Sequence, residues 1–272
     1  MPYRALALDV DGTLINAAQK KITAKTTAAL KDLQSRGVVV LLATGRSDYA
    51  STGVILGTDF IPDWRVCANG ALILDSDGRT MFERRLTSTD VETICAFAVK
   101  YGFSLNFTFD DAYYVYNKYS DYVAYYTASA GDVPYLRDGT DRSRHLQSLP
   151  YGAYLKMPDS FRSELAGLCP TVKLMQTVPG TYDINRQESS FDISPYNADK
   201  RHGVAWILSR LGLGFDELVA VGDSENDADL ILAAGMGVAV ANAPAHIRAL
   251  AGHVTGSVTE DGVVTVIERF FG

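Results

Sequence analysis

The sequence lacks a long apolar run, a surplus of basic residues and a regular pattern of cysteines. Without about 18 consecutive apolar residues, no transmembrane helix is expected. The N-terminal segment carries one Arg and a short apolar stretch, and acidic residues follow at once. A signal peptide would need a longer apolar region and a small-residue cleavage site. We therefore expect a cytoplasmic protein that is not bound to a membrane.

The cysteines and the net charge exclude further classes of protein. Cys67, Cys95 and Cys169 are odd in number and far apart, so they form neither a metal-binding pair nor a disulfide framework. Buried thiols in a reducing compartment are the simplest interpretation. The net charge is −7 and no basic patch stands out, which argues against a nucleic-acid partner. The same negative charge would repel a phosphate substrate unless a bound divalent cation supplied positive charge at the site.

What is present is typical of a globular α/β protein. Hydrophobic residues make up 47% and charged residues 21% of the 272-residue chain, which is long enough for two modest domains. The first 42 residues predict a strand, a helix and a second strand, at residues 5–8, 23–36 and 38–42. The pattern returns near the end, with helices at 199–211, 225–234, 245–250 and 261–270 and strands at 218–221 and 237–240. This order favours a doubly wound, mostly parallel sheet.

The middle of the chain has a different texture. Asn69-Gly70 and Asp77-Gly78 predict hairpin turns. Residues 84–189 hold twelve of the fifteen tyrosines and mix helix with strand, with a helix predicted at 88–100 and a strand pair at 104–109 and 112–116. We therefore predict a core domain at residues 1–83 and 190–272, interrupted by an inserted α/β domain at 84–189.

Polar residues follow the predicted strands of the core. They are Asp9 and Asp11, then Thr44-Gly45-Arg46, then Lys200, and finally Gly222-Asp223-Ser224-Glu225-Asn226-Asp227. Each group alone has an ordinary structural explanation, such as a turn, a helix cap or a solvated lysine. In open parallel sheets, however, ligands bind outside the carboxyl ends of the strands. Together these groups predict a site at that edge.

The acidic residues of this edge point to a metal ion. Asp9, Asp11 and Asp223 at adjacent strand ends would bring three carboxylates together, which is unfavourable unless something neutralises them. Mg²⁺ commonly joins one or two carboxylates to a substrate phosphate. A magnesium ion would also draw phosphate into an acidic protein.

The motifs DVDGTL, TGR, a lysine before a helix, and GDSENDADL resemble, in order and spacing, the four signature motifs of the haloacid dehalogenase-like (HAD) superfamily. CANGA and AAGMGVAVANA resemble its Cof-type sugar-phosphatase branch, subfamily IIB. The resemblance covers nearly all of the predicted core, whereas the insert matches only in position and size. It implies a phosphatase that hydrolyses a small phosphorylated metabolite through an aspartyl-phosphate intermediate, with the insert closing over the site and choosing the substrate.

The resemblance also implies residue roles. Asp9 would be the nucleophile and a Mg²⁺ ligand, Asp11 would bind the metal by its backbone carbonyl and act as general acid and base, and Asp223 would complete the ligands. The phosphate would be held by Val10 and Gly45 through backbone amides and by Thr44, Lys200 and Asn226 through side chains. Asp227 would orient Lys200 or a metal-bound water, Arg46 would support the site, and Arg186 is a speculative substrate contact.

Several alternatives stay open. The branch usually has Lys-Gly at the third motif, whereas Arg201 follows Lys200 here, so Arg201 is the other candidate cation. A phosphotransferase such as a hexose-phosphate mutase would use the same aspartates. A regulatory protein that kept an inactive form of this site would lack the nucleophile or a metal ligand, and all of these residues are present here. A haloacid dehalogenase would need no metal, so the cluster of acidic residues would have no explanation. The substrate and the oligomeric state are not determined by the sequence.

Overall fold

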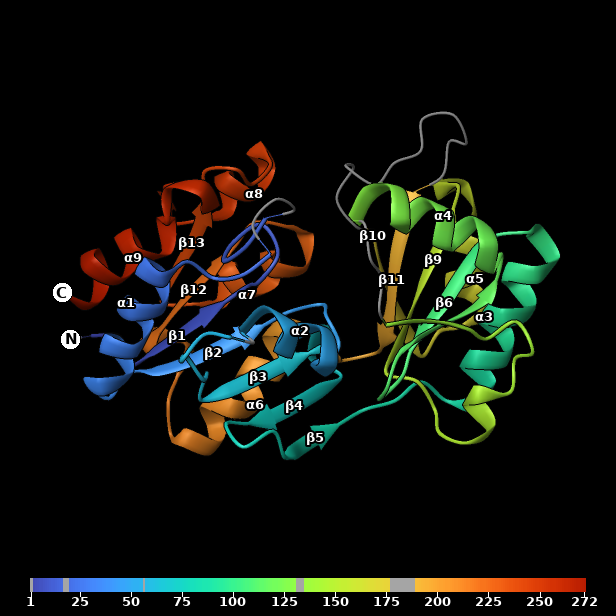
Figure 1. The fold of residues 1–272 in the computed structure, drawn as a ribbon, viewed down its shortest axis with the longest axis horizontal. Coiled ribbons are helices and arrows are strands. Elements are labelled where there is room, and N and C mark those ends of the chain that lie inside the picture. The colour runs from blue at the N-terminus through green and yellow to red at the C-terminus, as the bar shows by residue number, and fades with distance from the viewer. Residues whose placement is uncertain (1, 17–19, 56, 131–134, 177–188) are drawn as a thin grey trace. The chain divides into compact units, whose positions relative to one another are not determined.

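A computed structural model describes residues 2–16, 20–55, 57–130, 135–176 and 189–272 (Figure 1). The chain forms two compact units. Unit 1 comprises Met1–Phe82 and Asp199–Gly272, and unit 2 comprises Glu83–Ala198. The second boundary lies after 198 rather than 189, because the strand at Ser189–Pro195 pairs within the sheet of unit 2.

Unit 1 is built on an eight-stranded sheet with the order β14-β13-β12-β1-β2-β3-β4-β5. All pairs from β14 to β3 are parallel, and β3 and β4 are antiparallel around the predicted turn at Asn69-Gly70. The strands are β1 (Ala5–Leu8), β2 (Val39–Ala43), β3 (Trp64–Cys67), β4 (Leu72–Asp75), β5 (Thr80–Glu83), β12 (Leu218–Gly222), β13 (Met236–Val240) and β14 (His253–Thr255).

Both faces of this sheet are buried, since β1 contributes to two separate apolar cores. Leu6 and Leu8 pack with residues of α1 and α9, while Ala5 and Ala7 pack with residues of α6. Figure 1 shows α1 and α9 on one face of the sheet and α6 on the other. The helices of unit 1 are α1 (Ala24–Ser35), α2 (Asp48–Ile55), α6 (Lys200–Leu211), α7 (Ala228–Ala233), α8 (Ala245–Leu250) and α9 (Gly262–Phe271). The predicted doubly wound α/β fold is confirmed.

Unit 2 is a six-stranded sheet with the order β10-β11-β9-β6-β7-β8. The described pairs are antiparallel except β7 with β8. The strands are β6 (Ser104–Thr108), β7 (Tyr113–Asn117), β8 (Leu136–Asp138), β9 (Gly152–Met157), β10 (Val172–Gln176) and β11 (Ser189–Pro195), and the helices are α3 (Ser88–Tyr101), α4 (Tyr119–Ala130) and α5 (Arg162–Leu168). An aromatic-rich core lies between one face of this sheet, α3 and α5.

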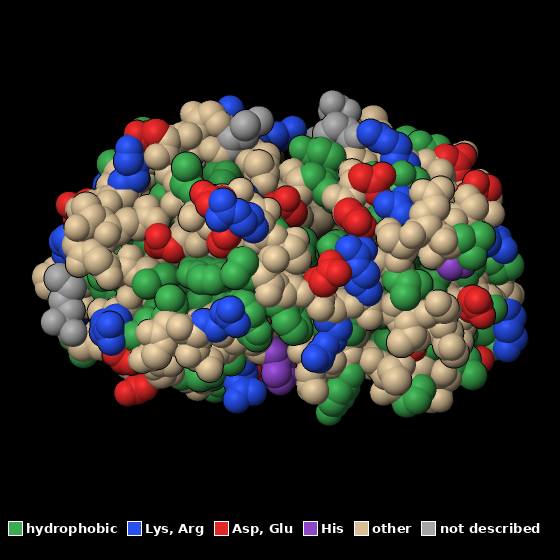
Figure 2. Space-filling view, turned by 90° about the horizontal axis from the view of Figure 1, so that it is seen from below, with side chains coloured by type: hydrophobic (Ala, Val, Ile, Leu, Met, Phe, Trp, Pro, Cys, Tyr) green, Lys and Arg blue, Asp and Glu red, His purple; other side chains and the backbone are tan. Residues whose placement is uncertain are grey.

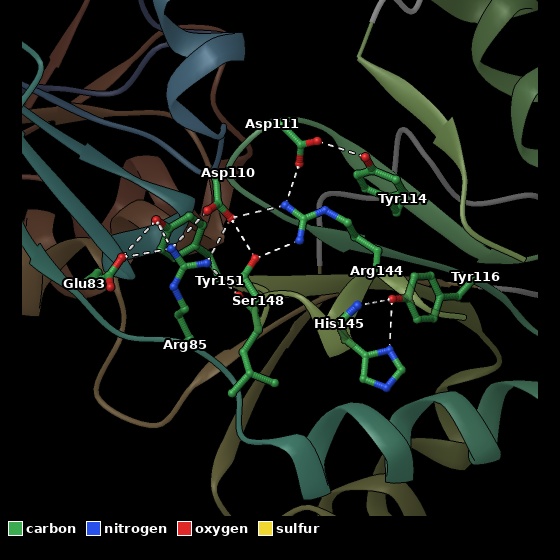
Figure 3. Close-up of polar contacts among 11 residues, drawn as sticks. Glu83, Arg85, Asp110, Asp111, Tyr114, Tyr116, Arg144, His145, Ser148 and Tyr151 are labelled. Carbon is green, nitrogen blue, oxygen red and sulfur yellow. Dashed lines mark hydrogen bonds and ion pairs between the residues drawn. The ribbon is translucent and has the colours of Figure 1, made fainter. Parts of the chain in front are cut away.

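A polar network holds the first residues of unit 2 to its loops (Figure 3). Arg85 donates to Asp110 Oδ1 at 3.0 Å and lies over the ring of Tyr151 at 4.1 Å. Arg144 donates to Asp111 Oδ1 at 3.1 Å. Cation–π contacts and ion pairs together fix guanidinium groups better than either alone. The network therefore anchors the chain where it enters unit 2.

The surface carries charges of both signs. On the face in Figure 2, acidic and basic side chains are interspersed with apolar and uncharged ones. Among the described residues, no helix is both long and apolar enough to span a bilayer.

Candidate active site

Three neighbouring parallel strands of unit 1 end at one edge of the sheet. Asp9 follows β1, Thr44 follows β2 and Asp223 follows β12. The Asp9 N–H donates to the Val221 carbonyl at 3.0 Å and so extends the β1–β12 pairing by one residue. The sheet register therefore places residues from both halves of the sequence side by side, as expected for this edge.

Lys200 is the centre of a buried ion-pair cluster. It is the first residue of α6 and is fully buried, and its Nζ donates to Asp9 Oδ1 at 2.6 Å and to Asp227 Oδ1 at 2.7 Å. Burial alone would lower the pKa of Lys200, but the carboxylates of Asp227 and Asp9 raise it above its ordinary value. Lys200 is therefore a permanent cation between two buried acids.

Asp227 is fixed by the loop that carries it. Its Oδ2 accepts hydrogen bonds from the backbone N–H groups of Asp223 and Ser224, each at 3.0 Å. A Cβ on Gly222 would lie 2.4 Å from Asp227 Cγ, so only glycine allows this side chain to fold back over the strand end. Asp227 therefore presents its other oxygen to Lys200.

A cluster of carboxylates lies beside Lys200. One oxygen each of Asp9, Asp223 and Asp227 lies within 4.8 Å of the others. No described residue makes a hydrogen bond to Asp9 Oδ2 or Asp223 Oδ1, although both atoms are buried. Buried acceptors of this kind are unfavourable without a partner.

The electrostatics of the cluster show the same deficit of positive charge. Burial raises the pKa of Asp9 well above its usual range, and Asp227, Asp223 and Asp11 raise it further against the effect of Lys200. Burial and Asp227 likewise raise the pKa of Asp223 to about 7. A hard cation bound by oxygen ligands would reverse both effects. The donor set and its unpaired oxygens therefore fit Mg²⁺.

The side chain of Asp11 does not belong to this cluster and pairs with Arg46 instead. It is exposed, and both carboxylate oxygens accept from Arg46, from Nε at 2.7 Å and from Nη2 at 2.7 Å. Arg46 also donates to the Ala50 carbonyl at 3.1 Å. This bidentate pair gives Arg46 a defined contact with the proposed acid–base residue.

Gly12 brings the first loop against Asp223. Its φ is +82°, and a Cβ at this position would lie 2.1 Å from Asp223 Oδ2. A side chain here would be strained by the backbone and would displace the carboxylate. The glycine of the Asp-x-Asp-Gly pattern is therefore required by packing as well as by the turn.

The loops after β2, β3 and β12 meet at a polar corner. Asn226 Nδ2 donates to Asn69 Oδ1 at 3.0 Å, and Asn69 N–H donates to the Thr44 carbonyl at 3.1 Å. A Cβ on Gly45 would lie 3.1 Å from Asn69 Oδ1. Thr44 is almost fully buried, and its Oγ1 accepts from the Arg46 N–H at 3.1 Å. The predicted phosphate-binding residues after β2 and β12 thus lie near one another.

Other residues singled out in the sequence have these positions. Val10 is fully buried, and its carbonyl accepts from Leu14 N–H at 2.9 Å. Arg201 is exposed and lies 5.8 Å from the ring of Phe215, whereas Lys200 lies in the cluster. Arg186 lies outside the described residues. Asn69 contacts Asn226, although its place in the sequence predicts only a turn; the CANGA motif is the signal that points to it.

The sequence model of the haloacid dehalogenase-like hydrolases matches residues 6–267. The chain belongs to this family. The resemblance seen in the four motifs is therefore confirmed, and the protein is an enzyme, a haloacid dehalogenase-like hydrolase.

This haloacid dehalogenase-like hydrolase has relatives that are named as phosphatases. Phosphatase YwpJ of Bacillus subtilis (strain 168) is 25% identical over 98% of this chain and 99% of its own length. The 5-amino-6-(5-phospho-D-ribitylamino)uracil phosphatase YcsE of the same organism is 24% identical over 98% of this chain and 95% of its own. The structure of the HAD subclass IIB sugar phosphatase BT4131 is similar in fold, with a TM-score of 0.81, 21% identity and coverage of 98% of this chain and 99% of that one.

Proposed function

We propose that the chain is a Mg²⁺-dependent phosphatase that hydrolyses small phosphate monoesters through an aspartyl phosphate on Asp9. The family and the named activities of relatives support the reaction class. A sugar phosphate or a similar metabolite is the proposed substrate, and unit 2 is the proposed source of substrate selectivity.

The observation that carries this proposal is the state of the Asp9 carboxylate. Its Oδ1 accepts from Lys200 at 2.6 Å, while Oδ2 has no hydrogen-bond partner among the described residues. A carboxylate nucleophile forms a covalent intermediate, so it must be held in place and accessible. Asp9 is held through Oδ1 and through its backbone in the sheet, and its unpaired Oδ2 leaves the carboxylate open to the metal or to phosphorus.

The metal would be held by the carboxylates of Asp9 and Asp223 and by the backbone carbonyl of Asp11. When bound, Mg²⁺ supplies positive charge that offsets the ionised acids and polarises the phosphoryl oxygens. Lys200 would add a second positive charge on the other side of Asp9. Thr44, Asn226 and the amides of Val10 and Gly45 would position the remaining phosphate oxygens.

In the first half-reaction an oxygen of Asp9 would attack phosphorus, the bond from phosphorus to the ester oxygen would break, and Asp11 would give a proton to the leaving alkoxide. Asp11 would then accept a proton from water as that water attacks phosphorus and releases Asp9 and phosphate. Each oxygen of Asp11 accepts one hydrogen bond from Arg46, and each keeps a second lone pair that can carry the proton.

The test is a panel of phosphate monoesters assayed for free phosphate with and without Mg²⁺. The panel includes sugar phosphates, nucleotides, pyridoxal phosphate, flavin mononucleotide and the ribitylaminouracil phosphate. Asp9→Asn should abolish turnover while the protein stays folded, and the exposed Asp159→Asn should be fully active. Steady turnover by Asp9→Asn would rule out the mechanism. Transfer to a sugar without release of phosphate would favour the phosphotransferase.

A further inference from the structure

Asn242 bridges two segments that are distant in the sequence. It lies just after β13, and its Nδ2 donates to the Gly12 carbonyl at 2.8 Å. Its Oδ1 accepts from the Val258 N–H at 3.0 Å. A carboxamide is the side chain that can donate to a carbonyl and accept from an amide at once. Both polar atoms of the Asn242 side chain therefore make hydrogen bonds to the backbone.

The Gly12 contact matters because Gly12 lies directly over Asp223. The space for a Cβ on Gly12 is occupied by Asp223 Oδ2, and the Gly12 N–H donates to the Ile15 carbonyl at 2.7 Å. The Gly12 N–H belongs to the same peptide group as the Asp11 carbonyl. Asn242 fixes the peptide group on the other side of Gly12. The two hydrogen bonds together define where the Asp11 carbonyl and the Gly12 Cα lie.

The other end of the bridge is a firmly held C-terminal segment. Val258 begins a 3₁₀ turn whose preceding Ser257 donates to Glu260 Oε2 from N–H at 2.9 Å and from Oγ at 2.7 Å. The next residue, Asp261, accepts from Thr23 Oγ1 at 2.7 Å, which joins the segment to the start of α1. The segment is thus fixed on both sides of Val258.

We propose that Asn242 is a positioning residue for the magnesium site. It holds Gly12 so that the Asp11 carbonyl and the Asp223 carboxylate would keep the spacing that both need to bind one Mg²⁺ ion. This inference rests on the proposed function of the same site. Residues that orient metal ligands typically change metal affinity about 10- to 100-fold when they are removed.

Two substitutions separate positioning from charge. Asn242→Asp keeps the acceptor for Val258 but cannot donate to Gly12, and it adds a negative charge near a cation site. Added charge alone would strengthen Mg²⁺ binding. Positioning predicts the opposite, a weakening of about 10-fold or more. Asn242→Ala removes both contacts without a change of charge and should weaken binding similarly.

The control is Asn117→Asp in unit 2. Asn117 Nδ2 also donates to backbone carbonyls, to Phe103 at 2.8 Å and to Ala98 at 3.2 Å. This variant loses comparable hydrogen bonds away from the site, so Mg²⁺ affinity should not change. Thermal unfolding of each variant reports how much stability was lost.

The measurement is Mg²⁺ titration of the metal-free protein by calorimetry, with phosphate release as a second readout. Wild type should bind Mg²⁺, both Asn242 variants should bind it more weakly, and their KM for the ester at saturating Mg²⁺ should be unchanged. Unaltered Mg²⁺ affinity in both Asn242 variants would overturn the inference while leaving the phosphatase proposal intact. Wild-type protein that binds no Mg²⁺ and releases no phosphate would overturn the proposed function itself.

Discussion

Replacement of Lys200 by Met tests the buried charge cluster. Lys200 is fully buried and pairs with Asp9 at 2.6 Å and Asp227 at 2.7 Å, and both acids are buried as well. Met has a similar length, so the packing of α6 changes little, but both carboxylates lose their counter-charge. Breaking a buried ion pair by removing one partner costs about 3–5 kcal/mol. We expect the free energy of unfolding of unit 1 to fall by about this amount.

The assay is urea unfolding followed by tryptophan fluorescence. The chain has two tryptophans, Trp64 and Trp206, and both belong to unit 1, where their rings lie 6.2 Å apart. Their fluorescence therefore reports the unfolding of the unit that contains Lys200. A chain with two units can unfold in more than one transition, and this signal follows the transition of unit 1.

The matched control is Lys31→Met. Lys31 also pairs with an aspartate, Asp59, but the side chains are 44% and 74% exposed. Exposed pairs contribute about 0–1 kcal/mol, so this variant should unfold like the wild type. Arg201→Met should also be mild, since Arg201 is exposed. Unchanged stability in Lys200→Met, or an equal loss in Lys31→Met, would refute the argument from burial.

Two further predictions concern Gly12 and Asp110. Gly12→Ala should abolish Mg²⁺ binding in calorimetry, because its Cβ would lie 2.1 Å from Asp223 Oδ2. The control is Gly37→Ala, which has a similar φ of +81° and no atom within 4 Å of the added Cβ. It should be destabilised by only about 1–2 kcal/mol, from left-handed strain, and should bind Mg²⁺ normally. Burial raises the pKa of Asp110, but Arg85 outweighs this effect and lowers the pKa below its ordinary value. The ionised carboxylate therefore stabilises unit 2 at pH values above its unfolded pKa of about 4. This stabilisation is lost as the pH falls through the pKa of Asp110 in the folded protein. Asp110→Asn should therefore flatten the acid limb of unit 2 stability, measured by near-UV circular dichroism of its tyrosines, and an unchanged limb would contradict the pairing.

Much of unit 1 could be predicted from the sequence because its strands are buried on both faces and read as apolar runs. β1, β2 and β12 lie within or close to the predicted ranges, and α8 occupies 245–250 as expected. The predicted helix at 225–234 begins instead as a 3₁₀ turn at Glu225–Asp227, followed by α7. The reason is that Asp227 folds back onto the Asp223 and Ser224 amides.

The sequence predicts candidate members of the site but not the contacts between them. Spacing along the chain gives strand ends, and the sheet then brings those ends together. It does not give side-chain partners, so it predicts neither the pairing of Asp11 with Arg46 nor the hydrogen bond from Lys200 to Asp9. The contact between Lys200 and Asp227 is expected only from the family resemblance. Asn242 was missed because its role depends on a contact with a residue 230 positions away.

The strand order of unit 1 has a consequence for synthesis on the ribosome. β1 lies between β2, which follows it closely, and β12, which begins at Leu218. Unit 2 is one continuous segment that ends at Ala198, so its whole chain has been made before β12 exists. Domains fold as units during translation. The inserted unit can therefore fold first, and β1, which leads into Asp9, keeps one edge unpaired until Leu218 and the residues after it have been made.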